Sequence, residues 1–516
     1  MQQSLIQKII SNWKSGLTVG LVSVPLGISL AVAAHATPTM GIITAFWACL
    51  IASLFGGSNY NVVGPAGALA GLLYAYATTF GTSSLPMLAI GAGILILIGY
   101  VMHIEKYLTF IPGSALHGFI LGVSITLILN QLHSILGLAT PTGHLSLIQR
   151  TLHALHHVAD ASPPSLYIFL ATLACLIVCA GYFPRLPGTI IVTPLGIATG
   201  YLCNHHLIPW QLQTLGSKFS SITPSILQLP TFHWRADYCF PVVVIAIVAL
   251  LETLISAKIA DGLTKTKHNK RKEVIGLGLA NIITGLCGGI PVTAVLARTA
   301  LNIKSGCSDK ISATIASACM LLVAFFCLPL FVYLPLTVMA AILIFIAGRL
   351  LEAEHFFLLF KYDRASFLVA LLVAFITIYE DPLIGILLGV VLSMLMFMTK
   401  LSIGYHEIRR ETADLEPLSS PIPTLEKTLT YTVKGPLVYI NAQTHLARLE
   451  KEIPLYQNII LDLHDVYFID IDGVEALNAI VGLGQHKGVS VRIIHPNPII
   501  RHFIKQDETL QKVLDN

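Results

Sequence analysis

The chain has 516 residues, of which 55% are hydrophobic and only 11% are charged. Because a soluble domain carries roughly 25% charged residues, this composition excludes an ordinary soluble protein and indicates one embedded in a lipid bilayer. The formal net charge of +4 by itself indicates no particular partner, and no nucleic-acid partner is expected.

A mildly basic, amphipathic segment comes first, at residues 1–14. No small-residue cleavage site follows it, so the segment lacks the pattern of a signal peptide. We expect it to form a short surface helix on the cytoplasmic side of the membrane.

Apolar runs separated by short polar breaks fill residues 15–400. A helix that crosses a bilayer needs about 20 apolar residues. The clear runs are 86–103, 112–137, 166–183, 241–260, 311–331, 335–351, 365–379 and 382–399, and two shorter ones rich in glycine and proline lie at 65–80 and 291–303. The sequence therefore predicts an α-helical polytopic transmembrane domain of about fourteen spans, with repeats at about 15–205 and 238–400.

The distribution of lysine and arginine predicts the orientation of these spans. With a cytoplasmic N-terminus, the inner loops hold Glu105 with Lys106, Arg185, Lys265, Lys267, Lys270, Arg271, Lys272, Lys304, Lys310, Arg349, Lys361 and Arg364. The long outer loops, 140–165 and 204–240, hold only Arg150, Lys218 and Arg235, and a short outer turn holds Glu380 and Asp381. This bias agrees with an even number of spans and with both termini in the cytoplasm. We expect an integral protein of a bacterial-type cytoplasmic (inner) membrane.

Two interrupted segments occupy corresponding places in the two repeats. They read GGSNYNVVGPAGALAG at 56–71 and GGIPVTAVLARTALN at 288–302, and each has a proline, Pro65 or Pro291, at a plausible first helical position. Irregular backbone at membrane depth survives only when it is buried in protein or lines a cavity. In transporters such paired half-helices direct their positive N-termini at an anion near the membrane centre.

Two charged residues lie within the apolar runs. Arg298 follows Pro291 by two helical turns, and it either shapes a positive potential for an anion or extends to the cytoplasmic surface. Glu252 follows eleven mainly apolar residues, and Ser256 lies one turn later on the same face. Three roles for Glu252 remain open: it carries a proton, it coordinates Na⁺ with Ser256, or it pairs with Arg298.

A smaller domain follows the membrane region. Residues 401–430 form a predicted linker, whose stretch 411–427 is polar and contains prolines. Alternating apolar runs at 437–442, 458–463 and 489–495 predict strands, and 475–488 has helical spacing that ends at a glycine. We expect a small cytoplasmic α/β domain at 431–516.

These stretches resemble the SulP anion transporters, the sulfate permease family, over almost the whole chain. The resemblance is carried by GLTVGLVSVPLGISLAVAAHATP, GGSNYNVVGPAGAL and KHNKRKEVIGLGLANIITGLCGGIPVTAVLARTALNIKSG, and the tail YQNIILDLHDVYFIDIDGVEAL resembles their STAS domain. It implies seven plus seven inverted spans that form a core and a gate domain. It also implies anion transport by elevator-type movement of the core against the gate, usually in a homodimer.

The resemblance also implies site residues. An anion is expected between the two broken helices, lined by Ala66, Gly67, Ala68, Val292, Thr293 and Ala294. Arg298 matches the arginine of the family's site, and Glu252 matches an acidic residue that in some members helps to carry H⁺ or Na⁺. Leu30 stands where the family often has an aromatic residue, after Pro25-Leu26 in place of Pro-Gln, which implies a drier wall at the first span.

The STAS-like tail departs from its relatives at one motif. Related domains read Asp-Ser-Ser-Gly, with a phosphorylatable serine, whereas this chain reads Asp470-Ile471-Asp472-Gly473. Asp472 either imitates part of a phosphorylated, regulatory state or acts as a helix N-cap. A cytosolic protein partner could bind through this domain.

Several functions follow from these observations. The first is secondary active transport of an inorganic anion, with sulfate or bicarbonate favoured and H⁺ or Na⁺ as the coupling ion. Alternatives are a symporter of dicarboxylates such as fumarate or succinate, a passive anion channel, and a protein that mainly recruits a cytosolic partner. We expect no enzymatic activity, because no nucleophile–base pair or phosphate loop has the required spacing.

No metal or cofactor is expected. The nine cysteines show no metal-ligand spacing. His153, His156 and His157 could bind a metal by spacing alone, but we interpret them as residues of a solvated loop.

Overall fold

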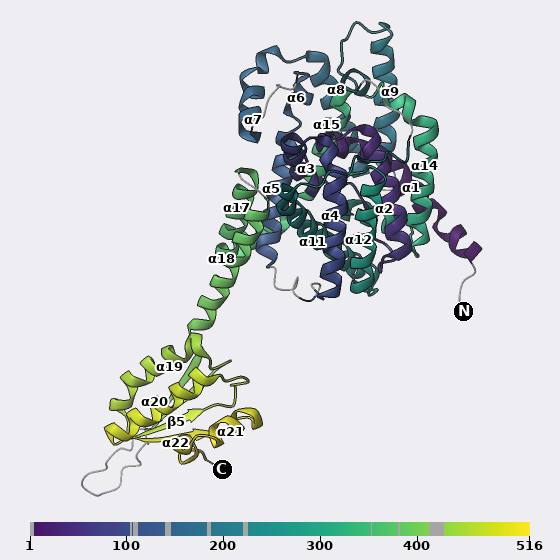
Figure 1. Ribbon diagram of the computed structural model, residues 1–516. Helices are drawn as coiled ribbons and strands as arrows, with labels where there is room; N and C mark the ends of the chain where they lie inside the picture. Colours follow the sequence, from purple (N-terminus) through teal and green to yellow (C-terminus); the bar gives the residue numbers. More distant parts are fainter. Residues whose placement is uncertain are drawn as a thin grey trace, which may run out of the picture. The chain divides into compact units, whose positions relative to one another are not determined.

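The computed structural model describes residues 5–103, 106, 112–139, 146–182, 187–219, 225–351, 353–379, 382–411 and 428–515 (Figure 1). Glu105, Arg185, Glu380 and Asp381, which the predicted orientation used, lie outside the described residues, as does 412–427 of the predicted linker.

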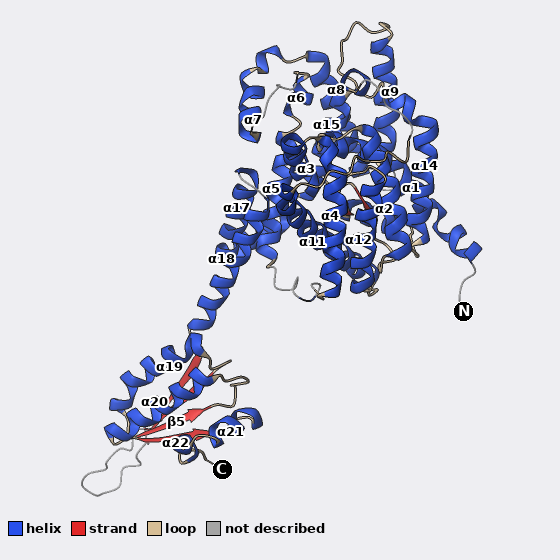
Figure 2. Ribbon diagram, viewed as in Figure 1, coloured by secondary structure: helices blue, strands red, loops and turns tan. Residues whose placement is uncertain are grey.

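The chain divides into two compact units, Met1–Val390 and Val391–Asn516, which we describe separately. The first unit is almost entirely helical (Figure 2). Its helices in the first half are α1 (Leu5–Ala33), α2 (Pro38–Phe55), α3 (Gly67–Phe80), α4 (Leu85–Val101), α5 (Gly113–Leu129), α6 (Leu132–Leu136), α7 (Leu147–His156), α8 (Pro163–Tyr182), α9 (Gly188–Asn204) and α10 (Leu215–Lys218). The second half holds α11 (Cys239–Thr264), α12 (Lys270–Leu286), α13 (Leu296–Lys304), α14 (Ile311–Phe331), α15 (Leu336–Leu350), α16 (Ala353–Tyr362), α17 (Arg364–Tyr379) and the start of α18 (Pro382–Ser402).

Within the described residues, eight helical segments are long and apolar enough to cross a membrane. Two shorter apolar helices, α15 and α17, add to them. The expected class, an α-helical polytopic membrane protein, is confirmed, whereas the number of fourteen spans stays a prediction. The segment 1–14 was predicted to form a short helix of its own. Its described part instead belongs to α1, which continues unbroken from Leu5 to Ala33.

The helices of the two halves pair reciprocally. Helix α4 packs against α12 and α2 against α14, while α5 packs against α17 and α8 against α15. We matched α1–α5, α8 and α9 of the first half, in order, with α11–α15, α17 and α18 of the second half. Under this matching, the α4–α12 contact corresponds to the α14–α2 contact, and the α5–α17 contact corresponds to the α15–α8 contact. This reciprocity agrees with the predicted repeat.

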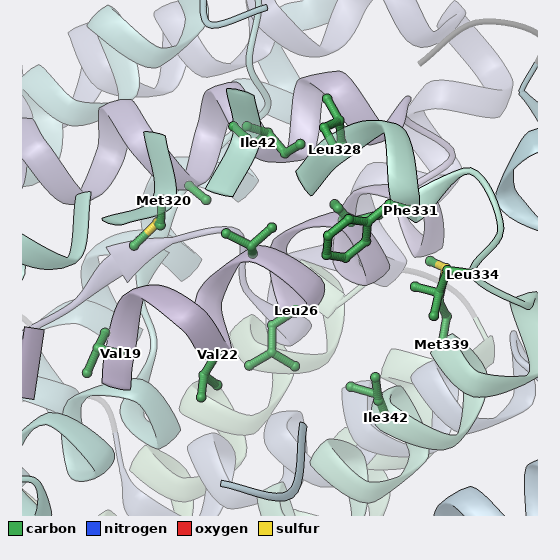
Figure 3. Packing of buried hydrophobic residues seen from close by; sticks show 14 of the residues in the cluster. Val19, Val22, Leu26, Ile42, Met320, Leu328, Phe331, Leu334, Met339 and Ile342 are labelled. Atoms are coloured by element: carbon green, nitrogen blue, oxygen red, sulfur yellow. The ribbon is translucent and has the colours of Figure 1, made fainter. Parts of the chain in front are cut away.

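A large apolar cluster joins α1, α2, α14 and α15 (Figure 3). Its buried members include Val19, Val22, Leu26, Ile42, Met320, Leu328, Phe331, Leu334, Met339 and Ile342. Because lipid tails are as apolar as these side chains, close packing rather than transfer out of water holds such helices together.

Glycines allow a close helix approach between α4 and α12. A Cβ atom on Gly93 would lie 2.6 Å from the carbonyl oxygen of Gly278, and one on Gly278 would lie 2.7 Å from Leu97 Cδ2. The two backbones therefore touch directly at this crossing, as small residues permit in membrane helix pairs.

The second unit contains a four-stranded sheet. Strands β3 (His406–Glu411), β4 (Thr428–Val433), β5 (Asn458–Asp462) and β6 (Ser490–Ile494) lie in this order. Strands β3 and β4 are antiparallel, and the other neighbours are parallel. The helices are α19 (Tyr439–Glu452), α20 (Ile471–Lys487), α21 (Pro498–Lys505) and α22 (Glu508–Gln511). Alternate strand residues such as Leu429, Tyr431, Ile459 and Leu461 fill the buried core.

The predicted strands at 458–463 and 489–495 and the helix at 475–488 match β5, β6 and α20. The predicted strand at 437–442 is wrong, because α19 begins at Tyr439. The side chain of Asn441 accepts a hydrogen bond of 2.9 Å from the Val438 N–H, and such local bonds favour a helix start over a short strand. Strand β3 lies inside the predicted linker 401–430 and pairs with β4, so the sheet begins before the expected boundary at 431.

We predict that Gly93→Ala lowers the melting temperature of the purified protein by about 2–6 °C, because overpacking a tight contact costs about 1–3 kcal/mol. Gly181→Ala in α8 is the matched control, since a Cβ atom there would meet nothing within 4 Å. Thermal unfolding in detergent measures both, and equal melting temperatures would contradict the contact.

Candidate functional site

The two interrupted segments meet in a short antiparallel pair of strands. Strand β1 (Val63–Gly64) pairs with β2 (Thr293–Ala294), with Val63 opposite Ala294 and Gly64 opposite Thr293. The N–H of Val295 adds a hydrogen bond of 3.0 Å to the carbonyl of Val62. Figure 2 draws the pair as strand among the surrounding helices. Each segment thus satisfies part of the other's backbone where its helix is broken.

A helix starts directly after each strand. Ala66 is the N-cap residue of α3 and Val295 is that of α13, and neither makes a capping bond with its side chain. The first N–H groups of a helix have no partner within the helix, and they carry the positive end of its dipole. Two such positive ends therefore start from one strand pair.

The expected helix starts at the prolines are wrong. Helix α3 begins two residues after Pro65, and α13 begins five residues after Pro291. The strand pair requires extended backbone at 63–64 and 293–294, which delays both helices. As a consequence, Arg298 lies in the first turn of α13 rather than two turns along it.

Arg298 connects the two segments. Its side chain is only 1% exposed, and its Nη2 donates a hydrogen bond of 2.7 Å to the carbonyl of Pro65. The Nη1 and Nε atoms are buried and have no hydrogen-bond partner among the described residues. A Cβ atom on Gly64 would lie 2.5 Å from Nη1, so a larger residue there would displace the guanidinium. Unpaired, buried N–H groups on a cation favour an anionic acceptor.

The six small residues predicted to line the site are all buried. Their N–H groups are not all available, because that of Val292 donates to Asn281 Oδ1 at 3.0 Å and that of Ala294 donates to Thr253 Oγ1 at 3.0 Å. On the second segment the unbonded donors must therefore come from the first turn of α13. On the first segment they come from Gly67 and Ala68, at the start of α3.

Leu30 lies on α1 and is 3% exposed. It belongs to a buried cluster with Ala33, Ala70, Leu127, Leu343 and Ala347, drawn from α1, α3, α5 and α15. A Cβ atom on Gly67 would likewise meet Leu350 and Leu127. The start of α3 therefore has apolar neighbours on the side of α5 and α15.

Glu252 lies on α11, which packs against β2. Its Oε2 atom is buried without a hydrogen-bond partner among the described residues. Thr293 itself donates to the carbonyl of Ala249 at 3.0 Å. One of the three roles left open for Glu252 was pairing with Arg298. The described part of the chain contains no ion pair between these two residues.

Ser256 is bonded elsewhere. Its hydroxyl lies 2.9 Å from Asn61 Oδ1 and 3.2 Å from Thr299 Oγ1, and Thr299 Oγ1 accepts a bond of 3.1 Å from the Val62 N–H. Ser256 therefore helps to hold the first segment against α13, one turn away from Glu252.

Sequence reasoning missed the role of Glu273. This side chain on α12 is 3% exposed. Its Oε2 accepts the N–H groups of Gly57 at 2.7 Å and Ser58 at 2.8 Å, and its Oε1 accepts Asn61 Nδ2 at 2.7 Å. A carboxylate in a basic run usually indicates a solvated surface, so the run KTKHNKRKE gave no signal of burial.

Asp472 is not the N-cap of α20. Asp470 holds that position, where its Oδ1 accepts the Gly473 N–H at 2.9 Å and its Oδ2 accepts the Tyr439 N–H at 2.9 Å. Asp472 is exposed in the first turn of α20, where its charge favours the helix dipole.

Comparison with known proteins adds the following. A family model described as the sulfate permease family matches residues 9–373, and one described as the STAS domain matches residues 420–513. The chain is 27% identical to YvdB of Bacillus subtilis (strain 168), over 94% of this chain and 91% of that protein. It is 24% identical to the bicarbonate transporter BicA of Picosynechococcus sp. (strain ATCC 27264 / PCC 7002 / PR-6), over 90% and 85%.

One solved structure is similar along the whole chain. The murine Slc26a9 anion transporter in the inward-facing state superposes with a TM-score of 0.84 at 16% sequence identity, covering 99% of this chain and 89% of that chain. This likeness shows that the two proteins share a fold.

We predict different effects on stability from neutralising the carboxylates of Glu273 and Glu252. Glu273→Gln should lower stability by about 1–3 kcal/mol, because its amide presents a donor to backbone N–H groups. Glu252→Gln should leave stability nearly unchanged, because Oε2 has no hydrogen-bond partner among the described residues. Thermal unfolding of the two variants measures the difference, and a greater loss in Glu252→Gln would contradict these assignments.

Proposed function

The chain belongs to the sulfate permease family and carries a STAS domain, and we propose that it is a secondary active transporter of sulfate or bicarbonate. The family's description supports sulfate, and the relative BicA, named for bicarbonate, supports the second anion. The observation that carries the proposal is the meeting of two helix N-termini and one buried arginine at a single strand pair.

We propose that the anion lies between the starts of α3 and α13, lined by Ala66, Gly67, Ala68, Val292, Thr293 and Ala294. Helix N–H groups would replace part of its hydration shell, and Arg298 would add a full positive charge. Arg298 is the only buried lysine or arginine among the described residues, which favours a compact anion. A long dicarboxylate would need a second cation to bind its far end.

We propose that transport proceeds by elevator-type movement. The core would contain α1–α4 and α11–α14, and the gate would contain the remaining spanning helices. The cluster around Leu30 supports this division, because apolar side chains from α1 and α3 face those of α5 and α15 there. Such non-directional contacts can exchange partners at little cost, unlike a buried polar network.

We propose H⁺ as the coupling ion, carried by Glu252. An oxygen atom of a buried carboxyl group without a hydrogen-bond partner among the described residues supports this choice, since protonation removes the cost of a buried charge. Na⁺ with Ser256 is the second candidate, but the Ser256 hydroxyl is already engaged by Asn61 and Thr299. A passive channel would not need a buried titratable group.

We further propose that the protein is a homodimer of a bacterial-type inner membrane with both termini in the cytoplasm. The basic residues between α11 and α12, and those in the first turn of α12, support the orientation: Lys265, Lys267, Lys270, Arg271 and Lys272.

The proposed function is tested by uptake into proteoliposomes of the purified chain. Labelled sulfate and bicarbonate are offered under separate pH and Na⁺ gradients, with unlabelled fumarate as a competitor. Uphill uptake driven by a pH gradient would support the proposal. Downhill flux only would indicate a channel, and preferential competition by fumarate would indicate a dicarboxylate symporter.

We predict that Gly64→Ala raises the KM for the anion about tenfold or more, because the added methyl group displaces Arg298 Nη1 without removing its charge. Arg298→Gln should raise KM at least as much. Gly262→Ala is the control, since a Cβ atom there meets nothing within 4 Å. An unaltered KM in both site variants would remove Arg298 from the site.

We predict that Glu252→Gln abolishes the dependence of uptake on the pH gradient while leaving exchange of labelled anion across the membrane. A neutral amide cannot release a proton, but it preserves the shape of the carboxyl group. Exchange and gradient-driven uptake are measured on the same vesicles. If gradient-driven uptake survives unchanged, Glu252 does not carry the coupling ion.

A further inference from the structure

Basic side chains gather where α1 and α3 end, at the membrane face opposite the start of α1. His35 follows α1, Arg150 lies on α7, and Lys218 ends α10. The guanidinium of Arg150 lies 4.0 Å from the centre of the Tyr74 ring, and the His35 ring lies 5.4 Å from the same ring. Two segments that are far apart in sequence thus contact one aromatic residue of α3, and the charge of Lys218 acts on the His35 ring.

The positive charges of this group are not neutralised by acids in the described residues. Asp160 is bonded to His157 at 2.9 Å, and Asp237 is bonded to Arg235 at 2.9 Å. Neither Arg150 nor Lys218 makes an ion pair among the described residues, and Arg150 Nε is buried without a hydrogen-bond partner there. The other two acids predicted at this face, Glu380 and Asp381, lie outside the described residues.

Tyr74, which the group contacts, lies on the same helix whose start belongs to the proposed site. Tyr74 comes seven residues after the start of α3, which places it about 10 Å along the helix from the proposed anion. Its neighbour Ala75 is exposed. Positive charge near a binding site raises the local concentration of anions and their association rate.

We propose that Arg150 and Lys218, together with His35, form an anion-attracting entrance that delivers small inorganic anions to the α3–α13 site from this face. The entrance rests on the proposed transport function and adds a second, weaker place where the anion is held. Because loss of hydration and then the charges of Lys218 and Arg150 lower the pKa of His35, its ring stays neutral near pH 7 and contributes N–H donation rather than charge.

A charge-sensing thiol tests the entrance without requiring transport. Ala75→Cys is introduced into the full chain together with Cys239→Ser, which removes the exposed native thiol among the described cysteines. The new thiol is then modified in detergent by two methanethiosulfonate reagents, one carrying a negative sulfonate group and one carrying a positive trimethylammonium group. Each rate is divided by the rate at which the same reagent modifies a small uncharged thiol in solution. An anion-attracting entrance favours the sulfonate reagent, and this preference should fade as salt screens the charges.

Charge-removing variants complete the test. Arg150→Gln and Lys218→Gln should each lower the sulfonate preference about threefold or more at low salt. Arg235→Gln is the matched control, because its guanidinium is already neutralised by Asp237. If Arg150→Gln fails to fold, the Lys218→Gln variant and the salt dependence of the sulfonate preference still test the entrance, because Lys218 is exposed. An unchanged preference in Lys218→Gln and at high salt would overturn the entrance.

Uptake measurements then connect the entrance to transport. In the same two variants the KM for labelled sulfate or bicarbonate at low ionic strength should rise, while kcat stays close to that of the parent chain. A changed thiol preference with an unchanged KM would overturn the role in delivery. Absence of any transport by the parent chain would instead reject the proposed function, and the thiol result would still report on the entrance itself.

Discussion

The antiparallel contact between β1 and β2 is the constraint on which the membrane unit depends. A helix cannot be interrupted within a bilayer unless the released N–H and C=O groups find partners. Here each broken segment supplies them to the other. The same pairing brings the starts of α3 and α13 together, and it puts Arg298 within reach of the Pro65 carbonyl. Local backbone chemistry thereby creates a region of positive potential in an apolar protein.

Buried polar groups around this contact fall into two kinds. Glu273, Asn61 and Asn281 have partners that fix the backbone of one segment or the other. Arg298 and Glu252, in contrast, each keep buried polar atoms without a hydrogen-bond partner among the described residues. Since an unpaired buried polar group is costly, the first kind is explained by the fold, and the proposed function gives the second kind an anion or a proton.

Much of the architecture was predictable because its signals are local. Apolar runs indicate membrane helices, and paired Gly-Gly and proline signals correctly marked the two interruptions. The strands themselves were not predictable, because a two-residue strand has no periodicity and depends on a partner about 230 residues away. The start of α13 was misplaced for the same reason. Glu273 escaped notice because its partners are backbone N–H groups of a distant loop.

In the C-terminal unit the errors came from competition between local signals. Alternation in LVYINA suggested a strand, but the Asn441 side chain stabilises a helix start. Two aspartates could cap α20, and only the geometry of Asp470, which also reaches the first N–H of α19, distinguishes them. The edge strand β3 was hidden by its charged sequence HEIRRE, which has few inward-facing apolar residues.

The long separation between β1 and β2 has a consequence for biosynthesis. At a synthesis rate of about 5–20 residues per second, β1 waits roughly 10–50 s before β2 leaves the ribosome. During that interval the first half has no strand with which to pair, and its interrupted backbone is poorly suited to lipid. Insertion of the nascent chain therefore requires that water, the translocation machinery or a chaperone shelter this stretch until the second half arrives.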